Sequence, residues 1–153
     1  MCARISKSRS LAGGRLGYAL AAPALIDDLN RMKNTFNPYS VNSLTMVAGI
    51  EAMRDRAYFD ACVRSTCEQR AASAAELRSL GFQVLDSATN FLFAAAPGMD
   101  GLLYYQKLKE RGVLVRYLNQ PTLRRFVRIT VGNEEQMRAL MDATRDILKE
   151  ETV

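Results

Sequence analysis

The stretch SKSRSLAGGRLGYA, residues 6–19, gathers residue types that together could hold a phosphorylated carbonyl compound. Lys7 offers a primary amine, which attacks a carbonyl once it has lost its proton. Ser6 adds a hydroxyl and Arg15 a planar cation suited to phosphate, while two adjacent glycines allow close backbone approach. A solvated lysine near a terminus explains the same letters, and the spacing is not that of a Gly-x-x-x-x-Gly-Lys-Ser/Thr phosphate loop.

Two arginines lie inside apolar runs further along the chain. Arg116 interrupts VLVRYL and Arg128 interrupts RFVRITVG, and both runs have the β-branched character of strands. An arginine in such a place lies on an edge or on the solvent face of a sheet, or it binds an anion. Position alone leaves these two interpretations open.

Composition removes several classes of function. The 153 residues suit one soluble domain with a real core, and the net charge of +5 comes from basic residues that alternate with acids, which does not indicate nucleic-acid binding. The sequence has no histidine, so a zinc site or a Ser/Cys-His nucleophile is not expected, and no metal is predicted. Three cysteines without a CxxC spacing do not suggest a disulfide framework. No apolar run approaches the ~20 residues of a membrane span, so we expect a cytoplasmic protein that does not bind membranes.

Local signals predict the order of the elements. Residues 16–22 read as a short strand or packed turn, and Pro23 suits the start of a helix that ends near Asn37. A second helix, from about residue 40 to 55, is apolar nearly all round and is therefore predicted to be buried. A third helix runs on to Gly81. The remaining chain predicts strands in FQVLDS and NFLFAAA, a helix at 100–112, strands at 113–118 and 125–132, and a last helix at 133–150.

This order favours an α/β (α+β sandwich) fold, with helices packed on a small, mostly antiparallel sheet.

The lysine stretch closely resembles the lysine segment of fold-type I, pyridoxal-phosphate-dependent aminotransferases. Within these it resembles histidinol-phosphate aminotransferases, in which Ser-Lys-x-x-x-Leu-Ala-Gly-x-Arg-x-Gly-Tyr is typical. The resemblance continues through NPYSVNSLTMVAGIEAM, GFQVLDSATNFLFA, GVLVRYLNQP and FVRITVG, and so covers nearly the whole chain in family order. It implies the C-terminal small domain of this fold, residues 41–153, behind a remnant of the large cofactor-binding domain, residues 1–40.

The resemblance also implies roles for single residues. Lys7 matches the lysine that holds the cofactor and moves the proton of the substrate Cα, while Ser6 and Arg15 match ligands of the cofactor phosphate. Arg128 matches the arginine that pairs with a substrate carboxylate, and Arg116 one linked to the substrate's distal anion. Asn90 matches the asparagine of an Ala-Asn-Phe motif, to which no role is assigned.

The activity implied is the transfer of an amino group between L-histidinol phosphate and 2-oxoglutarate, in histidine biosynthesis, by a homodimer. Family members carry most of the large domain before the lysine, and Gly14 stands where a leucine is usual. We therefore expect a C-terminal fragment that binds the cofactor weakly and has no useful turnover alone. Two alternatives remain. One is another member of the superfamily, such as an aminotransferase for aromatic amino acids or a phosphothreonine decarboxylase relative. The other is a non-catalytic small-domain module.

Overall fold

The computed structural model of the chain describes residues 2–151, which fall into two compact units that meet at Val63 and Arg64. The helices are α1 (Ile5–Ser8), α2 (Pro23–Phe36), α3 (Ser43–Arg54), α4 (Arg56–Ser79), α5 (Gly101–Glu110) and α6 (Glu134–Glu151). The strands are β1 (Cys2–Arg4), β2 (Gly17–Ala19), β3 (Gln83–Val84), β4 (Phe91–Ala95), β5 (Arg116–Tyr117) and β6 (Val127–Thr130). Helix α4 begins in the first unit and ends in the second. The division at residue 40 that the family resemblance implies stays a prediction.

The first unit is organised around a hairpin of β1 and β2, which pair antiparallel. The ladder continues through the hydrogen bond from Ile5 N–H to the Leu16 carbonyl oxygen (3.3 Å), so the loop between these two residues is closed at its base. Ile5 is buried, and a methyl group placed at Gly49 of α3 would overlap Leu16 Cδ2. The base of the loop therefore packs directly on α3.

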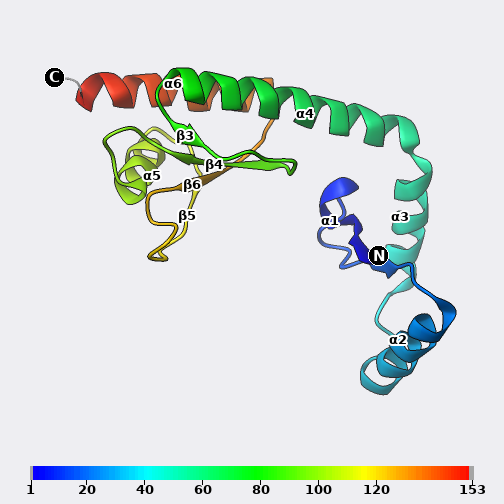
Figure 1. Ribbon diagram of the computed structural model, residues 1–153. Coiled ribbons are helices and arrows are strands. Elements are labelled where there is room, and N and C mark those ends of the chain that lie inside the picture. The colour runs from blue at the N-terminus through cyan, green and yellow to red at the C-terminus, as the bar shows by residue number, and fades with distance from the viewer. Residues whose placement is uncertain (1, 152–153) are drawn as a thin grey trace. The chain divides into compact units, whose positions relative to one another are not determined.

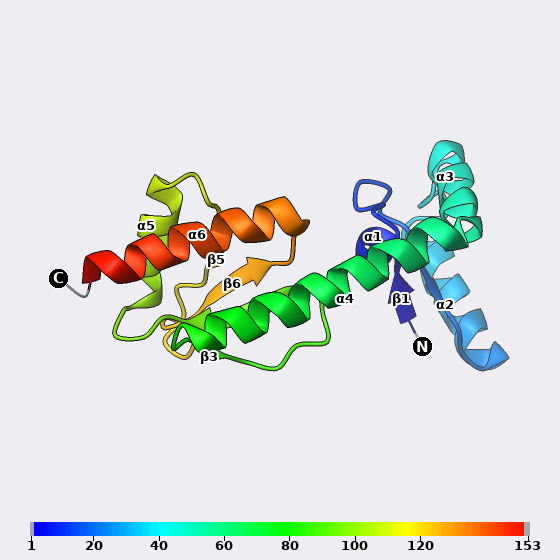
Figure 2. The ribbon, with the colours of Figure 1, turned by 90° about the horizontal axis from the view of Figure 1, so that it is seen from above.

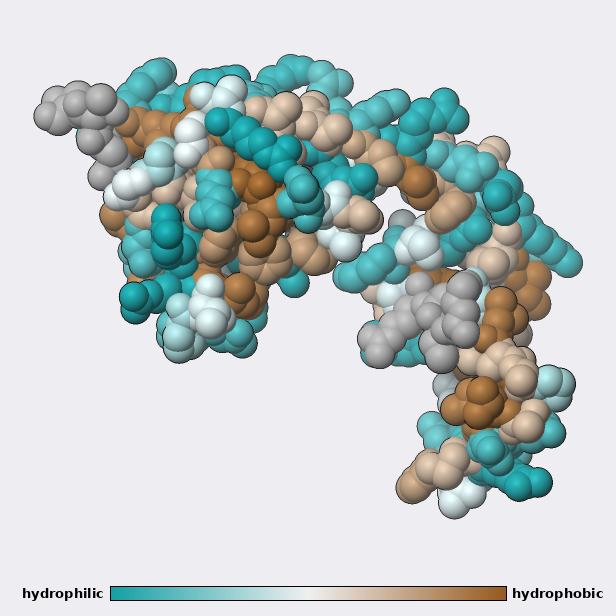
Figure 3. All heavy atoms as spheres, in the orientation of Figure 1, coloured by the Kyte–Doolittle hydropathy of each residue, from teal (hydrophilic) through white to brown (hydrophobic). Residues whose placement is uncertain are grey.

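Helices α2 and α3 form where the sequence predicts them. Pro23 occupies the first turn of α2, and the Asn42 side chain caps α3 by accepting a hydrogen bond from Thr45 N–H (2.8 Å). The predicted burial of α3 is wrong: its one buried residue is Gly49, and Leu44 is 83% exposed. Figure 3 shows brown, apolar side chains at the surface over α2 and α3. Nothing else described in the first unit covers these faces. Apolar periodicity shows which residues can be buried, but it does not show which neighbours would bury them.

The second unit is built on a four-stranded antiparallel sheet of order β3-β4-β6-β5. Successive side chains of a strand alternate between the two faces. Leu92, opposite Ile129 in the pairing of β4 with β6, is buried on the core face. Phe93, opposite Arg128, belongs to the other face. The predicted mostly antiparallel sheet is confirmed.

Strand β5 is shorter than the predicted strand 113–118. Val113 N–H donates to the Leu108 carbonyl oxygen (2.9 Å), and Gly112 has a positive φ of 76°. The first residues of the predicted strand therefore close the end of α5 rather than pair with β6.

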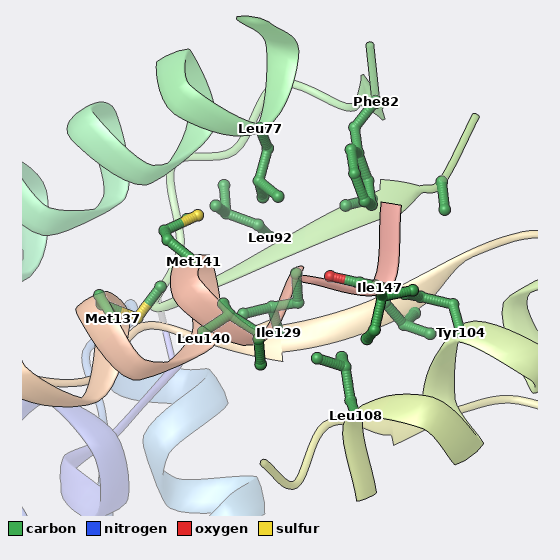
Figure 4. Packing of buried hydrophobic residues seen from close by; sticks show 14 of the residues in the cluster. Leu77, Phe82, Leu92, Tyr104, Leu108, Ile129, Met137, Leu140, Met141 and Ile147 are labelled. Carbon is green, nitrogen blue, oxygen red and sulfur yellow. The ribbon is translucent and has the colours of Figure 1, made fainter. Parts of the chain in front are cut away.

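One apolar core holds the second unit together. Figure 1 shows the sheet beneath α4 and α6, with α5 beside it, and Figure 2 shows α6 alongside the C-terminal half of α4. Arg145 of α6 forms an ion pair with Glu76 of α4. Figure 4 shows how side chains from all three helices and the sheet meet. The ten labelled there are Leu77, Phe82, Leu92, Tyr104, Leu108, Ile129, Met137, Leu140, Met141 and Ile147.

Local contacts define the end of α4 and the start of α6, as the sequence predicts. Gly81 has φ 87°, and Phe82 N–H donates to the Leu77 carbonyl oxygen (3.0 Å), which is a Schellman ending for α4. Asn133 and Gln136 exchange two side-chain-to-backbone hydrogen bonds at the start of α6.

No helix in the described part of the chain is long and apolar enough to cross a membrane.

A buried phenol should make the second unit sensitive to alkaline pH. Tyr104 shares a 2.7 Å hydrogen bond with the Thr144 hydroxyl, and burial raises the pKa of Tyr104 from 10.0 to about 12. The folded state keeps this proton while the unfolded state loses it, so the stabilisation is complete below pH 10 and is lost as pH rises toward 12. We expect the free energy of unfolding to fall by about 1.4 kcal/mol per pH unit in this window.

Urea unfolding at several pH values measures this slope. Tyr104→Phe should flatten it, whereas Tyr39→Phe, which alters a side chain that is 91% exposed, should not. An equal slope in wild type and Tyr104→Phe would contradict the assignment.

Candidate functional site

The lysine stretch forms a tight turn, residues 5–10, which we call the lysine turn. Lys7 is exposed on α1, and its carbonyl oxygen accepts a hydrogen bond from Ser10 N–H (3.4 Å). Ser10 and Arg15 both have left-handed backbones, with φ of 53° and 51°. Such conformations are costly for residues other than glycine and often mark ligand-binding loops. Ser6 and Lys7 thus lie on α1, and Arg15 lies on the loop whose base is closed beside them.

The chemistry of this loop fits a phosphorylated aldehyde. Four basic residues precede Asp27, the first acidic residue of the chain, so the local charge is wholly positive. Among the described residues, no ion pair or side-chain hydrogen bond occupies Lys7 or Arg15. An exposed amine can meet an aldehyde, while a guanidinium and the half-buried Ser6 hydroxyl can meet a phosphate. The donor set present here is therefore one that pyridoxal phosphate requires.

The second unit brings the two predicted arginines together. Arg116 of β5 is directly opposite Arg128 of β6, so both side chains leave the same face of the sheet, opposite the core. We call them the arginine pair. Arg116 is exposed, and Arg128 is half-buried. The Arg128 guanidinium carbon lies 5.4 Å from the centre of the Phe91 ring.

One buried donor of the arginine pair is unpartnered among the described residues. Arg128 Nε is buried and has no hydrogen-bond partner among the described residues. Like charges directly opposite each other on neighbouring strands destabilise a sheet, and a buried donor without an acceptor costs about 1–3 kcal/mol. A carboxylate, which accepts two parallel hydrogen bonds from one guanidinium, relieves both penalties.

Sequence reasoning missed the aromatic side of this site. Phe91 and Phe93 form an edge-to-face pair with ring centres 5.8 Å apart, on the same face of β4 as the arginine pair. The alternation in NFLFAAA is the signal that could have placed them there, because they alternate with the buried Leu92. Asn90 accepts a backbone hydrogen bond from Val131 N–H (2.9 Å) through its carbonyl oxygen, and its side chain is exposed.

Removing Arg128 should stabilise the chain in the absence of ligands. Arg128→Met keeps the aliphatic stem and removes both the unpartnered Nε and the like charge opposite Arg116. We expect the free energy of unfolding to rise by about 1 kcal/mol in chemical denaturation. Arg138→Met is the matched control, since Arg138 is exposed on α6 and forms an ion pair with Glu134 within its own helix.

The control should change stability by no more than about 0.5 kcal/mol. A clear loss of stability in Arg128→Met would mean that the guanidinium serves the fold itself, and would remove the argument for an anion.

Comparison with known proteins shows the family to which the chain is similar. A family model described as aminotransferase class I and II matches residues 2–143. Histidinol-phosphate aminotransferase 2 of Dechloromonas aromatica is 45% identical over 143 residues, which is 94% of this chain and 40% of the relative. The chain therefore spans about 40% of the length of the curated relatives it matches.

Solved structures give the same result for the fold. A crystal structure of a protein from Erwinia carotovora, described as a putative histidinol-phosphate aminotransferase, is 25% identical with a TM-score of 0.85; the match covers 99% of this chain and 42% of that one. The structure of histidinol-phosphate aminotransferase of Sinorhizobium meliloti, in complex with pyridoxal-5'-phosphate, is 23% identical with a TM-score of 0.80. The match covers 97% of this chain and 40% of that one.

Proposed function

Because this chain belongs to the class I and II aminotransferases, we propose that it is part of an enzyme that transfers an amino group between L-histidinol phosphate and 2-oxoglutarate in histidine biosynthesis. The observation that carries the proposal is the arginine pair, in which a buried, unpartnered Nε lies on the same face as a second guanidinium. The 45% identity with a histidinol-phosphate aminotransferase supports this choice of substrate.

The lysine turn, together with the loop that carries Arg15, would hold the cofactor. Lys7 Nζ is the group that would bind the aldehyde carbon of pyridoxal phosphate, and Ser6 and Arg15 would bind its phosphate. The cofactor, when bound, supplies a conjugated ring that takes up the negative charge left on the substrate carbon. Lys7 Nζ, when free, accepts the proton of the substrate Cα and later returns it, which is general acid–base catalysis by a single amine.

The arginine pair would bind the anionic ends of the substrates. The Arg128 guanidinium would hold a carboxylate by two parallel hydrogen bonds, which fixes the orientation of the substrate and hence which Cα bond can break. Arg116 would bind the second anionic group. In 2-oxoglutarate that group is the second carboxylate, whereas L-histidinol phosphate has no carboxylate and its phosphate is the one anionic group that the pair would bind, so one pair of cations serves both halves of the reaction.

The same proposal includes a homodimer in the cytoplasm that is complete only with further residues. Every residue of α2 is at least partly exposed, and its apolar side borders a groove of about 380 Å³ lined mainly by Ala19, Leu20, Ala21, Leu25, Leu29 and Met32. Exposed apolar surface of this kind supports association with other polypeptide. The 153 residues alone should therefore bind the cofactor weakly and show no useful turnover.

A chimera tests the function. The 143 residues of this chain that align with the Dechloromonas aromatica relative replace the matching segment of that protein, and glutamate formation from 2-oxoglutarate is measured with L-histidinol phosphate as the amino donor. We expect turnover, and a loss of about 10²–10⁴-fold in Lys7→Ala, because the proton transfer loses its amine. Lys33→Ala, which changes an exposed lysine of α2, should retain the activity.

Two results would contradict the proposal. Full activity in Lys7→Ala would remove the catalytic role of this lysine. A strong preference of the chimera for an aromatic amino acid over L-histidinol phosphate would leave the family in place but assign a different substrate.

A further inference from the structure

Arg9, two residues after Lys7, ties the lysine turn to the helices behind it. Its guanidinium carbon lies 3.7 Å from the centre of the Phe59 ring, a close face-on contact for a cation and an aromatic ring. Its Nη1 donates to the Asp55 carbonyl oxygen (3.3 Å). The Arg9 side chain is half-buried, so these contacts lie partly out of water.

Both contacts of Arg9 fall where α3 gives way to α4. Asp55 ends α3, and its N–H donates to the Glu51 carbonyl oxygen (2.9 Å). The Asp55 carboxylate accepts a hydrogen bond from Tyr58 N–H (3.1 Å) and so caps the first turn of α4. We call this break between the two helices the α3–α4 joint. Its hydrogen bonds hold its backbone in one conformation, so a neighbouring loop that binds to it is held in place as well.

The lysine turn has few other attachments. Ile5 is buried at its start, and the backbone hydrogen bonds that close the turn run from Arg9 N–H to the Ile5 carbonyl oxygen (3.1 Å) and from Ser10 N–H to the Lys7 carbonyl oxygen (3.4 Å). The turn is only one helical turn long, so it gains little stability from its own hydrogen bonds. Arg9 therefore supplies the side-chain anchor at the end of the turn, and Ile5 the one at its beginning.

We propose that Arg9 is a positioning residue for Lys7. The guanidinium, stacked on Phe59 and bonded to the Asp55 carbonyl, holds the lysine turn against the α3–α4 joint and so fixes the backbone from which the Lys7 amine extends. This inference rests on the catalytic role of Lys7 given above. It assigns to Arg9 no contact with the cofactor or the substrate.

Amide hydrogen exchange in the 153-residue chain, without cofactor, tests the anchor itself. Arg9→Met keeps the aliphatic stem and removes both contacts, and Phe59→Leu removes the ring alone. In both variants the amides of residues 9 and 10 should exchange about tenfold faster than in wild type, because the turn opens more often. Arg56→Met is the matched control, since Arg56 is exposed on α4 and forms a 3.6 Å ion pair with Asp60.

Unchanged exchange in both variants, or amides that already exchange at the rate of unprotected peptide in wild type, would overturn the proposal. Because this readout needs no enzymatic activity, it can hold even where the proposed function fails.

Kinetics of the chimera then test what the anchor does for Lys7. A misplaced amine slows proton transfer but leaves the arginine pair intact, so Arg9→Met should lower kcat by about 10–100-fold with KM for 2-oxoglutarate within about twofold of the parent chimera. Arg9→Lys keeps the charge but not the planar stack, and should recover part of kcat.

A change confined to KM, or equal losses in Arg9→Met and Arg56→Met, would show that Arg9 supports the fold without positioning Lys7. Faster exchange together with an unchanged kcat would overturn the link between the anchor and the catalytic lysine.

Discussion

The proposed anion site depends on one register in an antiparallel sheet, the pairing that sets Arg116 opposite Arg128. Two guanidinium groups on neighbouring strands repel each other, and the buried Nε of Arg128 has no acceptor among the described residues. The opposite face of the same strands carries the apolar core, where Val127 and Ile129 are almost fully buried. Burial on one face of β6 thus holds the unfavourable pairing of two cations in place on the other face.

The two units divide the proposed chemistry between them. The first carries a positively charged loop with an exposed amine at Lys7, tied to helices by Ile5 on one side and Arg9 on the other. The second carries cations fixed by a sheet rather than a loop, which suits groups that must orient a substrate. Most of the apolar side chains of α2 and α3 are exposed, and the chain spans about 40% of the length of its relatives.

The sequence predicts much of this fold because its signals are local. Pro23 begins α2, Gly81 ends α4, and Asp100 caps α5, each through a contact within a few residues. The register of β5 with β6 is not local, since a loop separates the strands, so the sequence predicts two arginines in strands but not that they face each other. The exposure of α3 was missed for a related reason, because apolar periodicity says which residues can be buried and not what buries them. The roles of the site residues came from family resemblance, and the contact of Arg9 with Phe59 has no sequence signature at all.

The most direct measurement of the central claim is the Nε–Hε resonance of Arg128 in an NMR titration of the chain with 2-oxoglutarate, at constant ionic strength. We expect a saturable shift of this resonance, with weaker binding in Arg116→Met because one of the two cations is gone. Sodium chloride at the same ionic strength should leave the resonance in place. A resonance that does not move as the dicarboxylate is added, or that moves equally with chloride, would contradict an anion site at the arginine pair.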